Sequence, residues 1–83
     1  MREFNSRDLD ALDFDSVCGA LRSGKSGIVL EKVARLPEAD VLCCRYKGKK
    51  FNVKFDLSYG VCIEAASDFS VDELEGIARI LAG

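Results

Sequence analysis

The C-terminal part of the chain carries apolar residues at the spacing of one helical face. Four of them stand at positions i, i+3, i+4 and i+7, namely Leu74, Ile77, Ala78 and Leu81. Just before them, Ser70 and Glu73 have the spacing of a capping box, in which each side chain bonds the backbone amide of the other residue. The pattern predicts a helix over 71–82 that ends at Gly83.

A second helix is predicted nearer the N-terminus. Its apolar residues have the same helical spacing and are Phe14, Val17, Cys18 and Leu21. Asp13 is suited to cap the first turn, and Gly24 is suited to a left-handed conformation after the last turn, which places the helix near 13–22. Residues 1–12 are mostly polar, and we expect an extended or irregular N-terminal arm there.

Between the two helices the apolar residues alternate with polar ones, which is typical of half-buried strands. A two-residue turn at Gly48-Lys49 has the leading glycine of a type II′ hairpin. That turn pairs Tyr46 with Phe51, Cys44 with Val53 and Leu42 with Phe55. All the large apolar residues of both strands then lie on one inner face of the sheet.

A second hairpin follows through a three-residue loop, Ser58-Tyr59-Gly60. It pairs Leu57 with Val61, Phe55 with Ile63 and Val53 with Ala65, again on the inner face. Residues 28–36 predict one more strand, with the turn 37–40 after it. We therefore expect a single α+β domain over 1–83: a helix, a four-stranded antiparallel meander and a helix, with both helices on one face of the sheet.

Length and composition narrow the possible functions. A chain of 83 residues has room for one small core, and its 48% hydrophobic and 31% charged residues are typical of a globular domain. The sequence has no histidine, which excludes histidine-based acid–base catalysis, the serine and cysteine triads that need it, and histidine-containing metal sites. We expect a protein that is not an enzyme.

The N-terminus lacks the apolar core of a signal peptide, so we expect a cytoplasmic protein. The four cysteines, Cys18, Cys43, Cys44 and Cys62, form no C-x-x-C pair and are expected to be reduced thiols. Because the adjacent pair cannot easily present both sulfurs to one ion, we expect neither a metal nor a cofactor.

Charge is unevenly distributed along the chain. Residues 1–20 hold two basic and five acidic residues (−3), residues 21–54 nine basic and three acidic (+6), and residues 55–83 one basic and six acidic (−5). These values sum to the net charge of −2. Either the acidic flanks and the basic centre neutralise each other across the folded surface, or the basic centre steers an acidic partner toward the protein.

Residues 19–26 match the G-x-x-x-x-G-K-[ST] pattern of a phosphate-binding loop, with Lys25 and Ser26 as the ligand-contacting positions. That loop requires a buried strand before it and a helix after it, followed by further strand–helix units. Here a helix is predicted before Gly24 and hairpins follow. The pattern around the motif therefore favours a helix end and a turn over a nucleotide site.

Two surfaces are candidates for binding. The first is the outer face of the sheet, where an apolar centre with basic neighbours is predicted from Val29, Val33, Val41, Cys43, Arg45 and Lys54. Such a mixed face suits an acidic protein partner or a second copy of the chain. On this basis we expect a small protein-binding module, such as an inhibitor or immunity-type protein, with a homodimer as a further possibility.

The second surface is the basic hairpin over 45–54, which carries Arg45, Lys47, Lys49, Lys50 and Lys54. Together with Lys25 it supports an alternative function, the binding of a nucleic acid or phosphate ligand. The predicted register turns Tyr46 and Phe51 inward, away from any base that might stack on them. The excess of acidic residues over the whole chain also favours the protein partner over nucleic acid.

Overall fold

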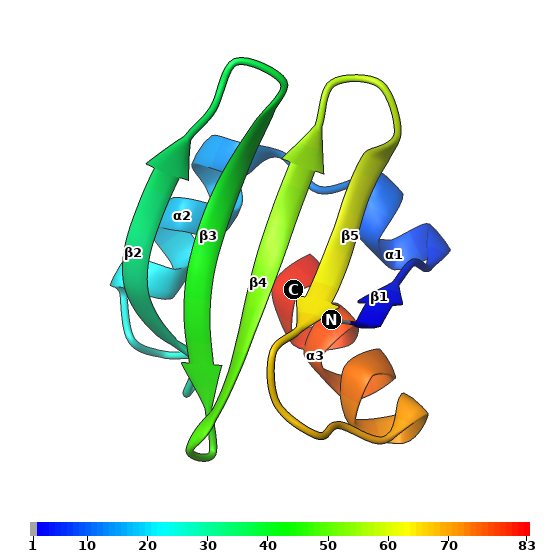
Figure 1. Ribbon diagram of the computed structural model, residues 1–83. Coiled ribbons are helices and arrows are strands. Elements are labelled where there is room, and N and C mark those ends of the chain that lie inside the picture. The colour runs from blue at the N-terminus through cyan, green and yellow to red at the C-terminus, as the bar shows by residue number, and fades with distance from the viewer. Residues whose placement is uncertain (1) are drawn as a thin grey trace.

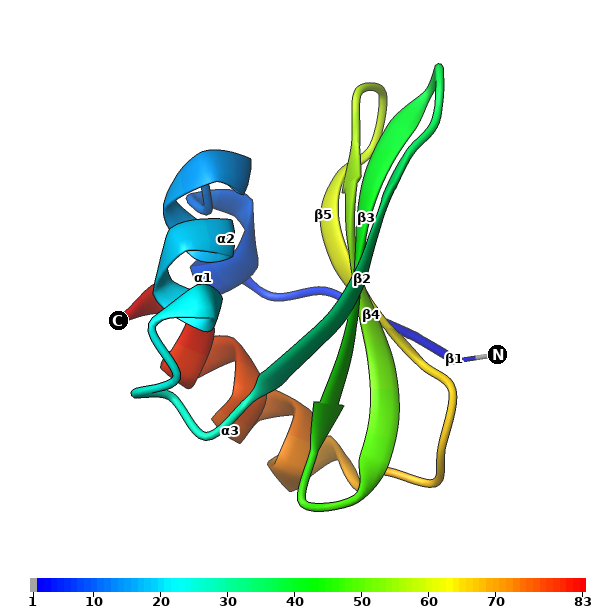
Figure 2. The same cartoon turned by 90° about the vertical axis from the view of Figure 1, so that its left-hand side faces the viewer.

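The computed structural model describes residues 2–83, which contain five strands and three helices (Figure 1). In chain order they are β1 (Arg2–Phe4), α1 (Arg7–Asp10), α2 (Phe14–Arg22), β2 (Val29–Arg35), β3 (Ala39–Tyr46), β4 (Lys49–Asp56), β5 (Gly60–Ala65) and α3 (Val71–Ala82). The strands form one antiparallel sheet in the order β1-β5-β4-β3-β2. Figure 2 shows the helices together on one side of this sheet, so the α+β class is confirmed.

The two predicted helices are present with their predicted caps. In α2 the carboxylate of Asp13 accepts a hydrogen bond from the amide of Ser16 at 3.0 Å. In α3 the capping box is complete: Ser70 Oγ accepts from the Glu73 amide at 3.1 Å, and Glu73 Oε1 accepts from the Ser70 amide at 2.9 Å. These local bonds satisfy amides that have no partner inside the helix, which is why the sequence alone placed both helix starts.

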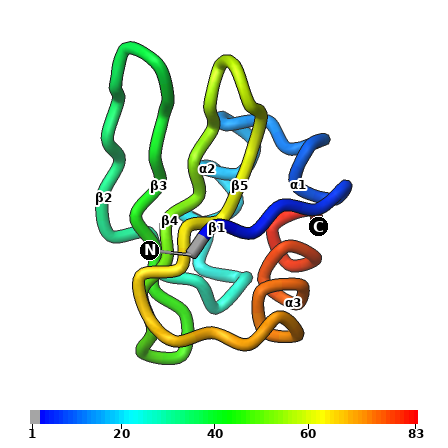
Figure 3. The backbone as a smooth tube through the Cα atoms, turned by 45° about the vertical axis from the view of Figure 1, so that its right-hand side comes forward, coloured from blue at the N-terminus to red at the C-terminus, as the bar shows by residue number. Residues whose placement is uncertain are grey.

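The N-terminal segment, expected to be an extended or irregular arm, forms a short strand and a short helix. Residues 2–4 add a fifth strand, with Phe4 opposite Ile63, and α1 follows immediately (Figure 3). Leu9 in α1 is fully buried, and α1 packs against β5 and α3. The segment has no regular apolar period of its own, and it takes its structure from the sheet edge and the helix beside it.

The β3–β4 hairpin has a different turn from the predicted one. Its two central residues are Lys47 and Gly48, with φ of 51° and 79°, and both are left-handed as a type I′ turn requires. The register therefore sets Tyr46 opposite Lys49, Cys44 opposite Phe51 and Leu42 opposite Val53, two residues away from the predicted pairing. A slip of two residues preserves the facing of every side chain, so the predicted inner face survives.

The β4–β5 hairpin is shifted in the same way. Asp56 lies opposite Gly60, and Phe55 lies opposite Val61 rather than Ile63. The Asp56 carboxylate accepts hydrogen bonds from the amides of Ser58 at 2.8 Å and Tyr59 at 3.0 Å, which closes the loop one residue earlier than predicted. Leu57 consequently lies in the loop with 84% of its surface exposed, and its predicted pairing with Val61 is wrong.

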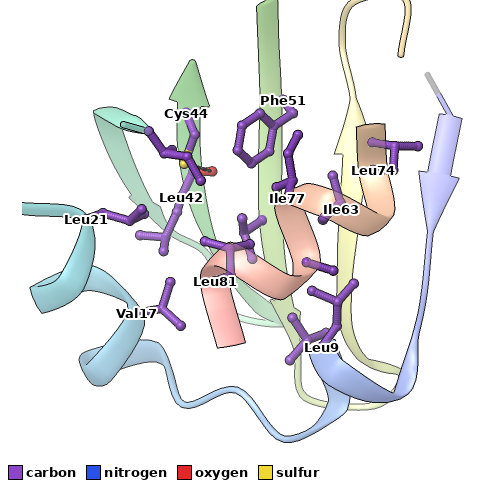
Figure 4. Close-up of a cluster of buried hydrophobic side chains, with 14 of the residues drawn as sticks. Leu9, Val17, Leu21, Leu42, Cys44, Phe51, Ile63, Leu74, Ile77 and Leu81 are labelled. Atoms are coloured by element: carbon purple, nitrogen blue, oxygen red, sulfur yellow. Dashed lines mark hydrogen bonds between the residues drawn. The ribbon is translucent and has the colours of Figure 1, made fainter. Parts of the chain in front are cut away.

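The core lies between the helices and the inner face of the sheet, as Figure 4 shows for a cluster of its side chains. All three helices and strands β3, β4 and β5 contribute buried residues, which include Leu9, Val17, Leu21, Leu42, Phe51, Val53, Ile63, Leu74 and Ile77. Strand β2 adds the partly buried Leu30 and Val33. The rings of Phe51 and Phe69 meet edge to face with centroids 6.0 Å apart. Because every helix of residues 2–83 is on this side, no helix of this part of the chain covers the opposite face of the sheet (Figure 2).

Candidate protein-binding face

We define the open face as the side of the sheet opposite the helices. Residues directly opposite one another in an antiparallel sheet point to the same side, so the strand register identifies its members. Across the sheet, starting at the β2 side, they form four rows: Val29, Arg45 and Lys50; Lys32, Cys43, Asn52, Glu64 and Glu3; Ala34, Val41, Lys54 and Cys62; and Ala39, Asp56 and Gly60. No helix of residues 2–83 covers this face (Figure 2).

The centre of the open face is weakly apolar. Val41 and Cys43 are neighbours on this face of β3, and both are half-buried. Val29, at the start of β2, is 57% exposed. A sheet face in contact with water alone usually carries polar residues at these positions, so the apolar centre favours contact with another surface.

Two of the basic residues of the open face, Arg45 and Lys54, are paired with acidic residues of the same face. Arg45 Nη2 lies 3.2 Å from the carboxylate of Glu31, and Lys54 Nζ lies 3.8 Å from that of Asp56. Arg45 uses one end of its guanidinium in this pair, and its Nε is buried without a hydrogen-bond acceptor among the described residues. A one-point pair of half-exposed groups contributes little to stability, so its partner is readily exchanged for another carboxylate.

Charge divides the open face into two halves. The β2–β4 half carries four basic residues against two acidic ones, which are Lys32, Arg45, Lys50 and Lys54 against Glu31 and Asp56. On the other half, Glu3 of β1 lies directly opposite Glu64 of β5. The apolar centre at Val41 and Cys43 therefore borders the basic half, where a negatively charged surface is favoured.

One predicted member of the site is misplaced. Val33 lies opposite Leu42, which is fully buried, and it packs against the core rather than on the open face. The cause is a β-bulge in β2: Leu30 lies opposite Cys44 and Lys32 opposite Cys43, so Glu31 is an extra residue. An extra residue reverses the alternation beyond it, and the prediction assumed a regular strand.

Arg35 is displaced by the same bulge. In a regular strand it would face outward with Val29, but its guanidinium lies over the ring of Phe14 in α2, 4.5 Å from the ring centroid. Its Nε also donates to Asp40 at 2.8 Å. The other five predicted residues, Val29, Val41, Cys43, Arg45 and Lys54, are together on the open face.

The basic hairpin does not form one continuous surface. Arg45, Lys50 and Lys54 are on the open face, whereas Lys49 points to the helical side. There its Nζ lies 3.0 Å from Glu73 and 5.2 Å from the centroid of the Phe69 ring. Because Lys49 lies on the opposite side of the sheet from Arg45, Lys50 and Lys54, the basic residues of the hairpin do not line one path for a phosphate backbone.

The phosphate-loop pattern has another structure here. Gly19 lies inside α2, and the segment after the helix leads to a strand rather than to a second helix. Gly24 has the left-handed φ of 75° expected of a helix end. The hydroxyl of Ser26 accepts a hydrogen bond from the amide of Ile28 at 3.1 Å, so it closes a turn. The prediction of a helix end and a turn is confirmed.

All four cysteines are free thiols. Cys44 is buried in the core, and burial raises the pKa of its thiol to about 12. Partial burial, with the charges of Glu3 and Glu64 nearby, also raises the pKa of Cys62. Thiols kept protonated in this way are poor nucleophiles, and both act as small apolar groups.

A groove of about 690 Å³ lies between the C-terminal end of α2 and the edge strand β2. Its walls include Leu21 and Arg22 from α2 and Leu30 and Val33 from β2. This groove was not predictable from the sequence, because the order of apolar and polar residues in β2 does not show the bulge that turns Val33 inward. The importance of Glu31 as a partner of Arg45 was missed for the same reason.

Comparison with protein-family models, with curated proteins and with solved structures finds no match for this chain. None of the helices within residues 2–83 has the length and apolarity that a membrane crossing requires.

Proposed function

We propose that this protein is a non-enzymatic module that binds an acidic surface of another protein through the open face of its sheet, as an inhibitor or an immunity-type protein does. The observation that carries the proposal is the apolar centre at Val41 and Cys43, which no helix of the described residues covers and which borders Arg45 and Lys54. The absence of histidine from the sequence supports a binding role over acid–base catalysis.

The two kinds of residue have separate roles in this proposal. Val41 and Cys43 lose their remaining exposure to water on binding, and this burial supplies most of the affinity. Arg45 and Lys54 exchange the carboxylates of Glu31 and Asp56 for those of the partner. Because one charge pair replaces another, the net gain in affinity is small, and the basic half mainly accelerates association.

The test is capture of binding proteins from a lysate on the immobilised chain, with and without nuclease. Matched columns carry Val41→Asp and a control, Leu57→Asp, which places the same charge on a residue that is 84% exposed in the β4–β5 loop. The proposal expects a protein that survives nuclease and is retained by wild type and the control but not by Val41→Asp. A captured protein that binds all three columns equally places the interface elsewhere, and loss of all binding after nuclease supports the nucleic-acid alternative.

The captured protein then allows a kinetic test. Reversing two charges with Arg45→Glu and Lys54→Glu should slow association and weaken its dependence on salt, whereas Val41→Asp should raise the dissociation rate. Circular dichroism establishes that each variant is folded, as expected for side chains on the solvent side of the sheet. Folded variants that bind like wild type would show that the open face is not the interface.

A further inference from the structure

Strand β2 forms one edge of the sheet and has a neighbour on one side only among the described residues (Figure 1). The backbone groups on its outer side are therefore available to another strand, as at any unprotected sheet edge. The edge is seven residues long, and the groove beside α2 runs along its inner side. This geometry suits an added strand whose inward side chains enter the groove.

The bulge gives β2 an unusual symmetry. Val29, Lys32 and Ala34 face outward, because they lie opposite Arg45, Cys43 and Val41. The side chain of Glu31 also lies on the open face of the sheet, where it pairs with Arg45. Leu30 and Val33 face inward. The order from Val29 to Ala34 is thus outward, inward, outward, then outward, inward, outward, which is symmetric about the Glu31–Lys32 peptide bond.

This symmetry identifies the occupant of the edge. We propose that β2 pairs antiparallel with β2 of a second copy of this chain, about a two-fold axis at the Glu31–Lys32 bond. Leu30 then lies opposite Val33 of the second copy, Val29 opposite Ala34, and Glu31 opposite Lys32. Every pair matches in facing, and the two central pairs join opposite charges on neighbouring strands, which stabilises a sheet.

The two neighbouring registers match neither the charges nor the facing of the side chains. A two-fold axis through Lys32 sets this lysine opposite its own copy and the inward Leu30 opposite the outward Ala34. An axis through Glu31 sets two carboxylates together and pairs Leu30 with Lys32. A bulge and a lysine usually discourage pairing at a sheet edge. Here the bulge and the lysine allow one register in which opposite charges meet and paired side chains lie on the same face, so they make the contact specific.

The proposed contact covers surface that is open in the single chain. Val29 is 57% exposed, and Leu30 and Val33 are partly exposed on the wall of the groove. In the dimer the two sheets become continuous and their open faces lie side by side. The inference concerns the sheet edge and goes beyond the proposed binding of another protein by the open face.

The test is sedimentation equilibrium of the purified chain up to about 1 mM, with a charge-swap cycle. Wild type should form dimers. Lys32→Glu sets glutamates together in both central pairs and should raise the dissociation constant roughly tenfold. The double variant Glu31→Lys with Lys32→Glu restores opposite charges and should recover dimerisation. Lys50→Glu, a reversal on the open face away from β2, is the matched control and should dimerise like wild type.

Isotope-filtered nuclear Overhauser effects on a mixed-label sample test the same register without any mutation. They should connect the methyl groups of Leu30 with those of Val33 in the other copy. A protein that stays monomeric throughout, an unchanged dimer in Lys32→Glu, or a double variant as weak as the single one would overturn the proposal. So would a dimer that Val41→Asp dissociates and Lys32→Glu does not, because the copies would then meet through the open face.

Discussion

Lys49 at the start of β4 holds Glu73 in the first turn of α3, with its Nζ 3.0 Å from Oε2 and 3.3 Å from Oε1. The same carboxylate accepts a hydrogen bond from the Ser70 amide at 2.9 Å. Glu73 therefore completes the cap of α3 and at the same time ties the helix to a hairpin 24 residues earlier in the chain. A local sequence motif here acquires a tertiary partner.

This arrangement predicts a component of acid sensitivity. The hydrogen bond from Ser70, and after it the contact with Lys49, lowers the pKa of Glu73 below its ordinary value of 4.5. A lowered pKa in the folded state stabilises the fold above pH 4.5, and this stability is lost as the pH falls through the folded-state pKa. Glu73→Gln should therefore reduce the difference between the urea midpoints near pH 7 and near pH 3.

The control for that experiment is Glu75→Gln, on the same helix, whose carboxylate lies 3.8 Å from Arg79. It should leave the acid sensitivity close to that of wild type. Some sensitivity should persist in Glu73→Gln, because hydrogen bonds from Ser58 and Tyr59 also lower the pKa of Asp56. Equal acid sensitivity in wild type and Glu73→Gln would contradict the role assigned to Glu73.

The N-terminal segment is predicted to be part of the folded core. Leu9→Ala removes a fully buried side chain between α1, β5 and α3, and it should lower the free energy of unfolding by about 2–5 kcal/mol. Leu57→Ala, the same change at a side chain that is 84% exposed, should stay within about 0.5 kcal/mol of wild type. Urea unfolding measures the free energy of unfolding of both variants. If Leu9→Ala lowered it as little as Leu57→Ala does, the N-terminal segment would not be part of the folded core.

Two phenylalanines on β4 should differ in their contribution to stability. Phe51 is fully buried and meets Phe69 edge to face, so Phe51→Ala should cost about 3–5 kcal/mol. Phe55 is only partly buried and contacts Phe14 at a centroid distance of 5.4 Å, so Phe55→Ala should cost about 1–2 kcal/mol. Chemical denaturation of the two variants checks the order, and the reverse order would place the core nearer the β4–β5 loop.

Glycine to alanine changes should have opposite signs at two positions. Gly48 has a φ of 79° in the β3–β4 turn, where alanine is strained, so Gly48→Ala should destabilise the fold by about 1 kcal/mol or more. Gly19 is in α2, where alanine is favoured, and Gly19→Ala should stabilise it by about 0.5–1 kcal/mol. A new Cβ has open space at both positions, so the backbone conformation decides the sign. Thermal unfolding of the two variants provides the comparison.

The cysteines should divide into two accessible and two protected thiols, and Cys62 should be the slower of the accessible pair because its pKa is raised. Cys43 and Cys62 are partly exposed on the open face, whereas Cys18 and Cys44 are buried. Titration with a chromogenic disulfide reagent should modify the first two in the native protein and all four in urea. Cys43→Ser should remove one native-state thiol and Cys44→Ser none. Rapid reaction of Cys44 in the folded protein would mean that this part of the core opens easily.

The inner face of the sheet was predictable although both hairpin registers were not. Alternation along β3 and β4 identifies which residues point inward, and this assignment is unaffected by a slip of two residues. The turn decides the register, and Lys47 adopts a positive φ, which is not expected of a lysine. Sequence analysis therefore found Leu42, Cys44, Phe51 and Val53 as core residues but paired them with the wrong partners.

The candidate site was predictable up to the bulge. Val41, Cys43, Arg45 and Lys54 follow from the alternation of two regular strands, and they are on the open face as expected. Val33 was assigned to that face because β2 was treated as regular, and the extra residue at Glu31 places it inside. The ion pair of Glu31 with Arg45 was not predictable either, because it joins two strands and depends on how they pair.

What the sequence determined by itself is whatever depends on neighbours a few residues apart. The caps at Asp13 and Ser70, the helical faces behind them and the inward residues of the longer strands are of this kind, because short-range bonds and a repeating period specify them. Tertiary structure alone decided the strand β1, the burial of Leu9, the bulge at Glu31 and the pairing of Lys49 with Glu73. Each of these depends on a surface contributed by a distant segment, and its stabilising energy exists only once the sheet and the helices have come together.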